Sequence, residues 1–154
     1  MNFTVSTIAV SLANYLQTSF PGVTFCQDPN QQGAVPPRMF LQQRYSFLKL
    51  RQGGRWLRTI GLDLVYEADY NLTNLQQLYQ TAAETLDIML ETFPYSDGET
   101  EGTTLLRTYD REWRVELNAM HYKFELRNWV ELPETVVPME TMDYNPEVIV
   151  NGNQ

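Results

Sequence analysis

The side chains that most often carry out chemistry in enzymes are sparse in this chain, which has one histidine and one cysteine. His121 occupies a polar position in a segment of alternating apolar and polar residues, with no serine or cysteine nearby. We therefore expect an exposed strand residue rather than the base of a hydrolase triad. Cys26 follows Phe25 in a short apolar segment, so we expect a small buried residue rather than a nucleophile.

Motifs for metal, phosphate or acid-base chemistry are incomplete. A single histidine excludes a two-histidine metal site, and a single cysteine excludes a cysteine cluster for zinc. Gly53-Gly54 lacks the glycine spacing and the following Lys-Ser/Thr of a phosphate-binding loop. Glu84 and Asp87 lie three residues apart on a predicted helix face, where carboxylates usually face water. The sequence thus predicts a protein that is not an enzyme, with no catalytic residue, no cofactor and no metal.

Opposite charges are separated along the chain. Residues 38–58 contain 6 basic side chains and no acid, whereas residues 59–106 contain 9 acids and no base. Arginine binds carboxylates through two parallel hydrogen bonds and tolerates partial loss of water. A basic surface that binds an acidic surface on the next copy forms a heterologous contact, which closes into a ring or continues as a filament. We therefore predict a homo-oligomer.

The predicted subunit interface joins these two runs of charge. Its basic side comprises Arg51, Arg55, Trp56 and Arg58, and its acidic side comprises Asp87, Glu91, Asp97, Glu99 and Glu101. One alternative is a solvated surface whose arginines pair with acids of the same chain. Another is a nucleic-acid-binding module that uses Arg44, Lys49, Arg51, Arg55 and Arg58. Against this module, the net charge is −8, and Tyr45 and Trp56 are few aromatic residues for a platform that stacks bases.

Apolar periodicity predicts two helices and several strands. The first helix is expected over residues 6–19 with Thr4 or Ser6 as its cap, and the second over residues 71–93 with a capping box of Thr73 and Gln76. The remaining elements are a short strand at 23–26, a hairpin of 39–51 and 55–67, an acidic loop at 96–102, and alternating strands at 105–117 and 120–127. This pattern predicts an α+β domain, a two-layer sandwich with two helices packed on one face of a mainly antiparallel sheet.

The turn predicts the register of the hairpin. Two glycines, Gly53-Gly54, supply the positive φ angles that a two-residue turn needs. The expected opposite pairs are Phe47 with Ile60, Tyr45 with Leu62 and Leu41 with Tyr66 on one face, and Arg44 with Asp63 on the other. Near the turn, Trp56 is expected on the inner face with Lys49, Arg51 and Arg58, and the outer face is expected to carry Leu48, Leu50 and Leu57.

The length of 154 residues fits one globular domain, predicted over residues 1–132. Residues 133–154 contain 3 prolines, 4 acids and no base, which predicts an extended acidic C-terminal arm that docks on a neighbour or frays. The first 20 residues contain no Lys or Arg, so no secretory signal is expected. No stretch reaches the roughly 18 apolar residues of a membrane span. We therefore expect a soluble protein of the reducing cytosol with no membrane partner.

The order of helix, short strand, proline-rich connection, glycine-turn hairpin, long helix and final aromatic hairpin resembles that of small tail terminator, or tail completion, proteins of tailed bacteriophages. Residues 121–130, His-Tyr-Lys-Phe-Glu-Leu-Arg-Asn-Trp-Val, are similar to the alternating aromatic strand that closes such proteins. The opening helix ending in Phe20-Pro21 and the segment from Arg55 to Tyr66 are similar too. The resemblance covers residues 1–132 and leaves the arm uncovered.

This resemblance implies a structural protein of the virion neck, assembled in the host cytoplasm and commonly a hexameric ring. Such a ring caps the head-proximal end of the tail tube, terminates tube polymerisation and offers the docking surface for the head connector. The implied partners are further copies of the chain, the tail tube protein and the head-tail connector protein. Genomic DNA would pass through the lumen without specific binding, because an acidic lumen repels phosphates. The alternative within the same class is another neck component, such as a head-tail joining protein.

Overall fold

Residues 2–27 and 35–133 are described by the computed structural model, and the predicted arm lies outside the described residues from residue 134 onward. In chain order the elements are α1 (Val5–Leu16), β1 (Thr24–Cys26), β2 (Arg38–Arg51), the short 3-10 turn η1 (Gln52–Gly54), β3 (Arg55–Glu67), α2 (Leu75–Met89), β4 (Thr92–Tyr95), β5 (Thr104–Glu116) and β6 (Ala119–Val130). The predicted order of helices and strands is confirmed, with one additional strand, β4.

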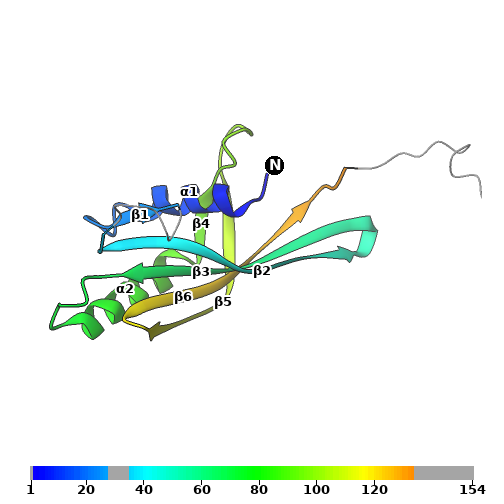
Figure 1. Ribbon diagram of the computed structural model, residues 1–154. Helices are drawn as coiled ribbons and strands as arrows, with labels where there is room; N and C mark the ends of the chain where they lie inside the picture. The colour runs from blue at the N-terminus through cyan, green and yellow to red at the C-terminus, as the bar shows by residue number, and fades with distance from the viewer. Residues whose placement is uncertain (1, 28–34, 134–154) are drawn as a thin grey trace, which may run out of the picture.

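The six strands form one mixed sheet in the order β1-β2-β3-β6-β5-β4. β1 runs parallel to β2, and the other neighbouring pairs are antiparallel. The sheet is curled, so that β4 at one edge lies against α1, which also contacts β2 near the other edge (Figure 1). The chain is therefore an α+β protein with a mainly antiparallel sheet, as the sequence predicts.

α1 is amphipathic, with a buried stripe of apolar residues. Ile8, Leu12 and Leu16 recur at intervals of four and are almost fully buried. At the start of the helix, the Thr7 backbone N–H donates to the Thr4 hydroxyl (3.2 Å), and the Thr4 N–H donates to the Thr7 hydroxyl (3.2 Å). These two bonds satisfy backbone groups that a helix start leaves free, and they confirm Thr4 as the cap.

α2 begins later than the sequence predicts. Its N-terminal cap is Asn74, whose side chain makes no capping hydrogen bond, so the predicted capping box of Thr73 and Gln76 is wrong. The residues before the helix form a turn instead, in which the Leu72 N–H donates to the Asp69 carbonyl (3.2 Å). Capping patterns in the sequence report only on neighbouring residues. Here the turn that follows β3 makes α2 begin four residues later than predicted, at Leu75.

α2 also ends earlier than the sequence predicts, because Phe93 belongs to β4. Phe93 and Tyr95 are both fully buried, and a strand places residues two apart on the same face. Phe93 pairs with Leu106 of β5, and Pro94 between the two rings is tolerated because β4 is an edge strand. Burial of two aromatic rings outweighs the helical spacing that the sequence shows up to Phe93.

One hydrophobic cluster joins both helices to the sheet. β6 contributes Tyr122, Phe124 and Leu126, all fully buried, and α2 contributes Tyr79 and Leu86. We call the face of the sheet that carries these β6 residues the inner face, and the opposite face the outer face. The polar residues between them in β6 lie on the outer face, which confirms the predicted alternation.

The hairpin register differs from the prediction for two reasons. Three residues, Gln52–Gly54, form the turn in place of two, and Arg51 pairs with Arg55. An additional residue in β2, Arg44, then forms a bulge, and a slip of one residue turns a side chain to the other face. The predicted pairs of Phe47 with Ile60, Tyr45 with Leu62, Leu41 with Tyr66 and Arg44 with Asp63 are therefore wrong.

The bulge places Tyr45 over Gly61 on the outer face. A β-carbon at Gly61 would overlap the Tyr45 ring, so the absence of a side chain at this glycine makes room for the tyrosine. The Tyr45 hydroxyl reaches across β3 and donates a hydrogen bond to Glu125 of β6. This contact ties β2, β3 and β6 together at the point where the hairpin leaves the core.

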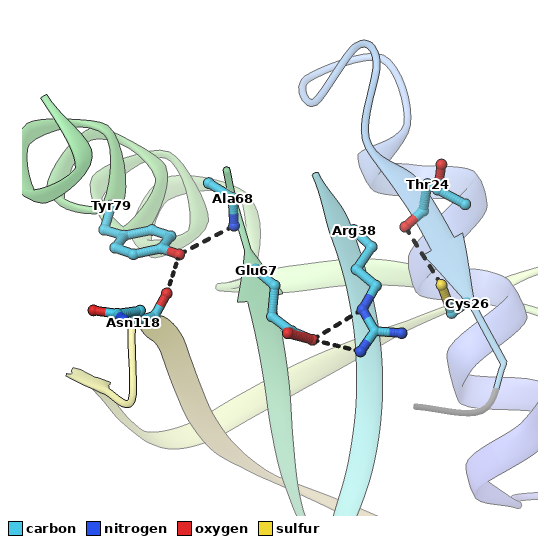
Figure 2. A network of polar contacts seen from close by, with 7 residues as sticks. All are labelled: Thr24, Cys26, Arg38, Glu67, Ala68, Tyr79 and Asn118. Carbon is cyan, nitrogen blue, oxygen red and sulfur yellow. Dashed lines mark hydrogen bonds and ion pairs between the residues drawn. The ribbon is translucent and has the colours of Figure 1, made fainter. Parts of the chain in front are cut away.

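A tyrosine of α2 joins the helix to one end of the sheet. The Tyr79 hydroxyl donates to the Asn118 carbonyl (2.6 Å) and accepts from the Ala68 N–H (3.0 Å), as Figure 2 shows. Burial raises the pKa of Tyr79, so the hydroxyl keeps its proton. Beside it, Arg38 at the start of β2 binds Glu67 at the end of β3 (2.8 Å), which holds the two strands in register.

Replacing Tyr79 with Phe is expected to lower the free energy of unfolding by about 1–3 kcal/mol, because it leaves the buried Ala68 N–H without an acceptor. Urea unfolding followed by tryptophan fluorescence measures this change. Tyr70→Phe, at a tyrosine that is 67% exposed, is the matched control and should change stability little. Equal effects of the two substitutions would contradict the role of the Tyr79 hydroxyl.

Replacing Gly61 with Ala is expected to cost about 1–3 kcal/mol of stability, because the new methyl group displaces the Tyr45 ring. In a chain that already carries Tyr45→Ala, the same substitution should cost much less, since the ring is gone. The difference between the two costs, measured by urea unfolding of all four proteins, is the coupling energy. A coupling near zero would show that the ring does not cover this glycine.

Candidate functional site

The hairpin of β2 and β3 extends beyond the hydrophobic core. Residues 47–56 are mostly exposed, and the last part of β6 pairs alongside them, with Trp56 opposite Val130 and Leu57 opposite Trp129. Figure 1 shows this extension leaving one end of the sheet, while α2 lies toward the other end. An element that projects in this way has most of its surface available to a partner.

The two faces of the hairpin carry different residues, because directly opposed residues of neighbouring strands share a face. The outer face carries Phe47, Lys49, Arg51, Arg55, Leu57 and Trp129, and the inner face carries Leu48, Leu50, Trp56, Arg58 and Val130. Trp56, Leu57 and Arg58 thus lie on the faces that the sequence predicts. The bulge turns the end of β2 over, so the predicted placement of Lys49, Arg51, Leu48 and Leu50 is wrong. The predicted basic side of the interface is split between two faces.

Two cations of the outer face lie over aromatic rings. Lys49 Nζ is 5.5 Å from the centre of the Phe47 ring, and Arg55 Cζ is 3.9 Å from the centre of the Trp129 ring. Both rings are more than two-fifths exposed. Such contacts are weak in water and strengthen when a partner excludes the water. This face is therefore a basic and aromatic surface.

The projecting part of the hairpin, residues 47–58, contains no Asp or Glu. Among the residues that the structure describes, no Asp or Glu forms an ion pair with Lys49, Arg51, Arg55 or Arg58. Arg58 donates a hydrogen bond to the Ser46 hydroxyl (3.1 Å) within the inner face. Within the described residues, arginines elsewhere in the protein pair with acids of their own chain, as Arg38 does with Glu67, but the cations of the projecting part of the hairpin form no such pair.

Asp97, one of the predicted interface acids, has an internal role. It is 8% exposed, and its carboxylate accepts hydrogen bonds from the N–H groups of Asn2 (2.9 Å), Glu99 (3.0 Å) and Thr100 (2.7 Å) and from the Thr100 hydroxyl (2.9 Å). The backbone bond from Thr100, followed by that from Asn2, holds the pKa of Asp97 well below its usual value. Asp97 therefore ties the loop before β5 to the N-terminal residues.

The other predicted acids lie in two places. Asp87 accepts a hydrogen bond from Tyr122 (2.5 Å), and Glu91 pairs with Arg107 (3.3 Å) in an exposed ion pair near the end of α2. Glu99 accepts a bond from the Asn2 side chain (2.9 Å), and Glu101 is exposed in the same loop. The strand β4 separates the two groups. The structure does not bring the five predicted acids together on one surface.

A groove of about 1160 Å³ lies between the N-terminal residues and the hairpin. Its lining comprises Asn2, Phe3, Gly54, Arg55, Trp56, Arg58, Trp129, Val130, Glu131, Leu132 and Pro133. Three of the four predicted basic-side residues, Arg55, Trp56 and Arg58, therefore share this groove. Sequence reasoning missed the contribution of β6 and the N-terminus, because these segments are more than 50 residues away along the chain from the hairpin residues of the groove, Gly54 to Arg58.

Sequence reasoning also missed a polar pair on the outer face. Asp63 is 6% exposed, and its Oδ2 lies 2.8 Å from Nδ1 of His121, which is half-buried rather than exposed as predicted. The register places Lys123 opposite Asp63, so the acid has two basic neighbours on β6. Within the described residues, no serine or cysteine bonds to His121. Cys26 is buried, as predicted.

The part of the chain covering residues 2–27 and 35–133 contains no group of three or more His, Cys, Asp or Glu side chains that could hold a metal ion. In the same residues, no helix is both long and apolar enough to cross a membrane.

No model of a known protein family matches this chain, and no curated protein matches it. The features of this chain that bear on its function are therefore the geometry and charge of the hairpin and the groove.

Asp97→Asn is expected to lower the melting temperature at pH 7. The pKa of this carboxyl group is lower in the folded protein than its value of 3.8 in the unfolded chain. The carboxylate therefore stabilises the folded protein at pH values above 3.8, and this stabilisation is lost progressively as the pH falls below 3.8. The difference in melting temperature between the natural protein and Asp97→Asn should therefore narrow between pH 5 and pH 2. Glu101→Gln, at an exposed acid of the same loop, is the control and should show a small difference at every pH. A constant difference for Asp97→Asn would contradict this role.

Proposed function

We propose that this chain is a tail terminator protein of a tailed bacteriophage, forming a ring that caps the head-proximal end of the tail tube. The observation that carries the proposal is the projecting hairpin, whose cations Lys49, Arg51 and Arg55 have no carboxylate partner within the described part of their own chain. The similarity of the element order to that family supports it.

The positions of the charges support a head-to-tail contact between copies. The hairpin leaves one end of the sheet (Figure 1), whereas Asp87 and Glu91, at the end of α2, lie beside Tyr122 of β6 and Arg107 of β5, away from the projecting tip. The ion pair of Glu91 with Arg107 is exposed at both side chains, so water and salt weaken it and Glu91 is free to take a second partner. Contacts between different surfaces of identical copies close into a ring when the rotation allows it.

The layered arrangement is part of the same proposal. We propose that both helices form one layer on the inner face of the sheet, in a two-layer sandwich. The single hydrophobic cluster that contains residues of both helices and of the inner face supports this arrangement. The outer face, which continues into the basic face of the hairpin, is then available for contact with neighbouring copies.

Within this proposal, the ring ends tube polymerisation because one of its faces reproduces the contact between tube layers and the other does not. The second face docks the head connector. The net charge of −8 supports a lumen that repels phosphates, so that genomic DNA passes without specific binding. The partners are thus the tail tube protein, the connector and further copies of the chain in the virion.

Electron microscopy and sedimentation of the purified full-length protein test the ring, and the expected result is a closed ring of fixed copy number. Arg51→Glu should reduce the ring population at least about tenfold, which corresponds to about 1.4 kcal/mol. Glu91→Arg added to the same chain should restore the ring, because each copy then carries both reversed partners. Arg114→Glu is the control, since Arg114 pairs with Glu116 of its own chain (2.7 Å).

Monomers under all salt conditions would contradict the ring. Failure of Glu91→Arg to restore the ring would reject the pairing of Arg51 with Glu91. A monomer retained on single-stranded DNA at low salt and released at high salt would favour the nucleic-acid-binding module. One observation favours this second candidate: the exposed rings of Phe47 and Trp129 lie beside Lys49 and Arg55, an arrangement that suits base stacking.

A further inference from the structure

The groove beside the hairpin has the chemistry of a peptide-binding site. Its volume of about 1160 Å³ exceeds the roughly 300–1,000 Å³ of typical small-molecule pockets. Trp56, Trp129 and Leu132 supply apolar surface, and Arg55 and Arg58 supply positive charge. Glu131 also lines the groove, but among the described residues no ion pair joins a carboxylate to either arginine. Such a groove suits a chain segment that is both apolar and acidic.

The C-terminal segment of this chain, residues 134–154, has that composition. It contains four acids and no base: Glu134, Glu140, Asp143 and Glu147. It also contains eight apolar or aromatic residues: Val136, Val137, Met139, Met142, Tyr144, Val148, Ile149 and Val150. This apolar content is unusual for a segment that serves only as a solvated tail, because solvated tails are poor in apolar residues. The charge and the apolar content complement the groove.

We infer that the groove of each copy binds the C-terminal segment of a neighbouring copy. Leu132 and Pro133 line the rim of the groove, so the segment begins at its edge. β6 carries the chain toward the tip of the hairpin, away from the core, and a proline favours an extended conformation for the residue before it. This course of β6 away from the core favours the groove of a neighbouring copy over the chain's own groove as the binding site.

The length of the segment permits this contact. Its 21 residues span at most about 70 Å when extended. A domain of this size has a radius of gyration of about 14 Å, so the segment reaches across an adjacent copy. Exchange of such segments around a ring would join each copy to the next by a second contact, which shares Arg55 and Trp129 with the outer face of the hairpin. The inference rests on the proposed function in one respect, namely that copies of the chain lie next to one another.

Photo-crosslinking of the full-length protein tests the inference. One preparation carries a photoreactive phenylalanine analogue at Tyr144, and a second preparation is labelled with ¹⁵N and lacks the analogue. The two are equilibrated at raised salt, returned to low salt and irradiated, and the crosslinked peptides are identified by mass spectrometry. The expected crosslinks join position 144 to ¹⁵N-labelled peptides that contain Trp56 or residues 129–133.

Variants in the ¹⁵N-labelled copy define the groove. Arg58→Glu should lower the yield of these crosslinks at least fivefold, and Arg58→Lys should retain most of it. Ser46→Ala removes the internal hydrogen-bond partner of Arg58 and should leave the yield unchanged, which separates charge in the groove from support of the hairpin. Arg114→Glu, an exposed reversal on β5, is the matched control.

Each outcome either supports or overturns the inference. Crosslinks confined to the unlabelled chain, or to peptides outside the groove, would overturn it. Rings without groove crosslinks would overturn the inference and leave the proposed function standing. Groove crosslinks between copies without a closed ring would support the inference and contradict the proposed function.

Discussion

The pairing register between β2 and β3 is the constraint on which the surface of this protein depends. The three-residue turn Gln52–Gly54 and the bulge at Arg44 together decide which face of the hairpin each side chain occupies. The bulge is held by Tyr45, which lies over Gly61 and bonds to Glu125. Because of this register, Arg51 lies on a basic face and Arg58 lies in a groove. One hairpin thus offers two chemically different surfaces.

Acidic and basic side chains have different roles in this protein. Acids in the body of the protein serve its own structure: Asp97 binds the N-terminal residues, and Asp63 lies beside His121 under the outer face. Lys49 and Arg55 of the hairpin have no carboxylate partner in the described residues, and each lies over an aromatic ring instead. Buried acids with internal bonds stabilise the monomer, whereas exposed cations on a projecting element are suited to a partner. This division supports an assembly function.

The body of the protein provides the rigidity that such a hairpin needs. β3 and β6 run through the core and continue directly into the extension, so the inner face of the hairpin is continuous with the hydrophobic cluster. Through one hydroxyl, Tyr79 ties α2 to the residue that follows β3 and to the turn between β5 and β6. Strands anchored in a packed core hold their exposed ends in a defined direction, which favours a contact of defined geometry between copies.

The amino-acid sequence by itself determined α1 with a cap at Thr4 or Ser6, the alternation of β6 and the separation of charge, because each of these follows from residues close together in the chain. Tertiary structure alone decided the end of α2, the faces of β2 and the internal role of Asp97. In each case the deciding contact joins distant segments: the Phe93 ring with the core, Tyr45 with Gly61 and Glu125, and Asp97 with Asn2. Burial and hydrogen bonds formed across the fold outweigh local preferences of a few tenths of a kcal/mol per residue.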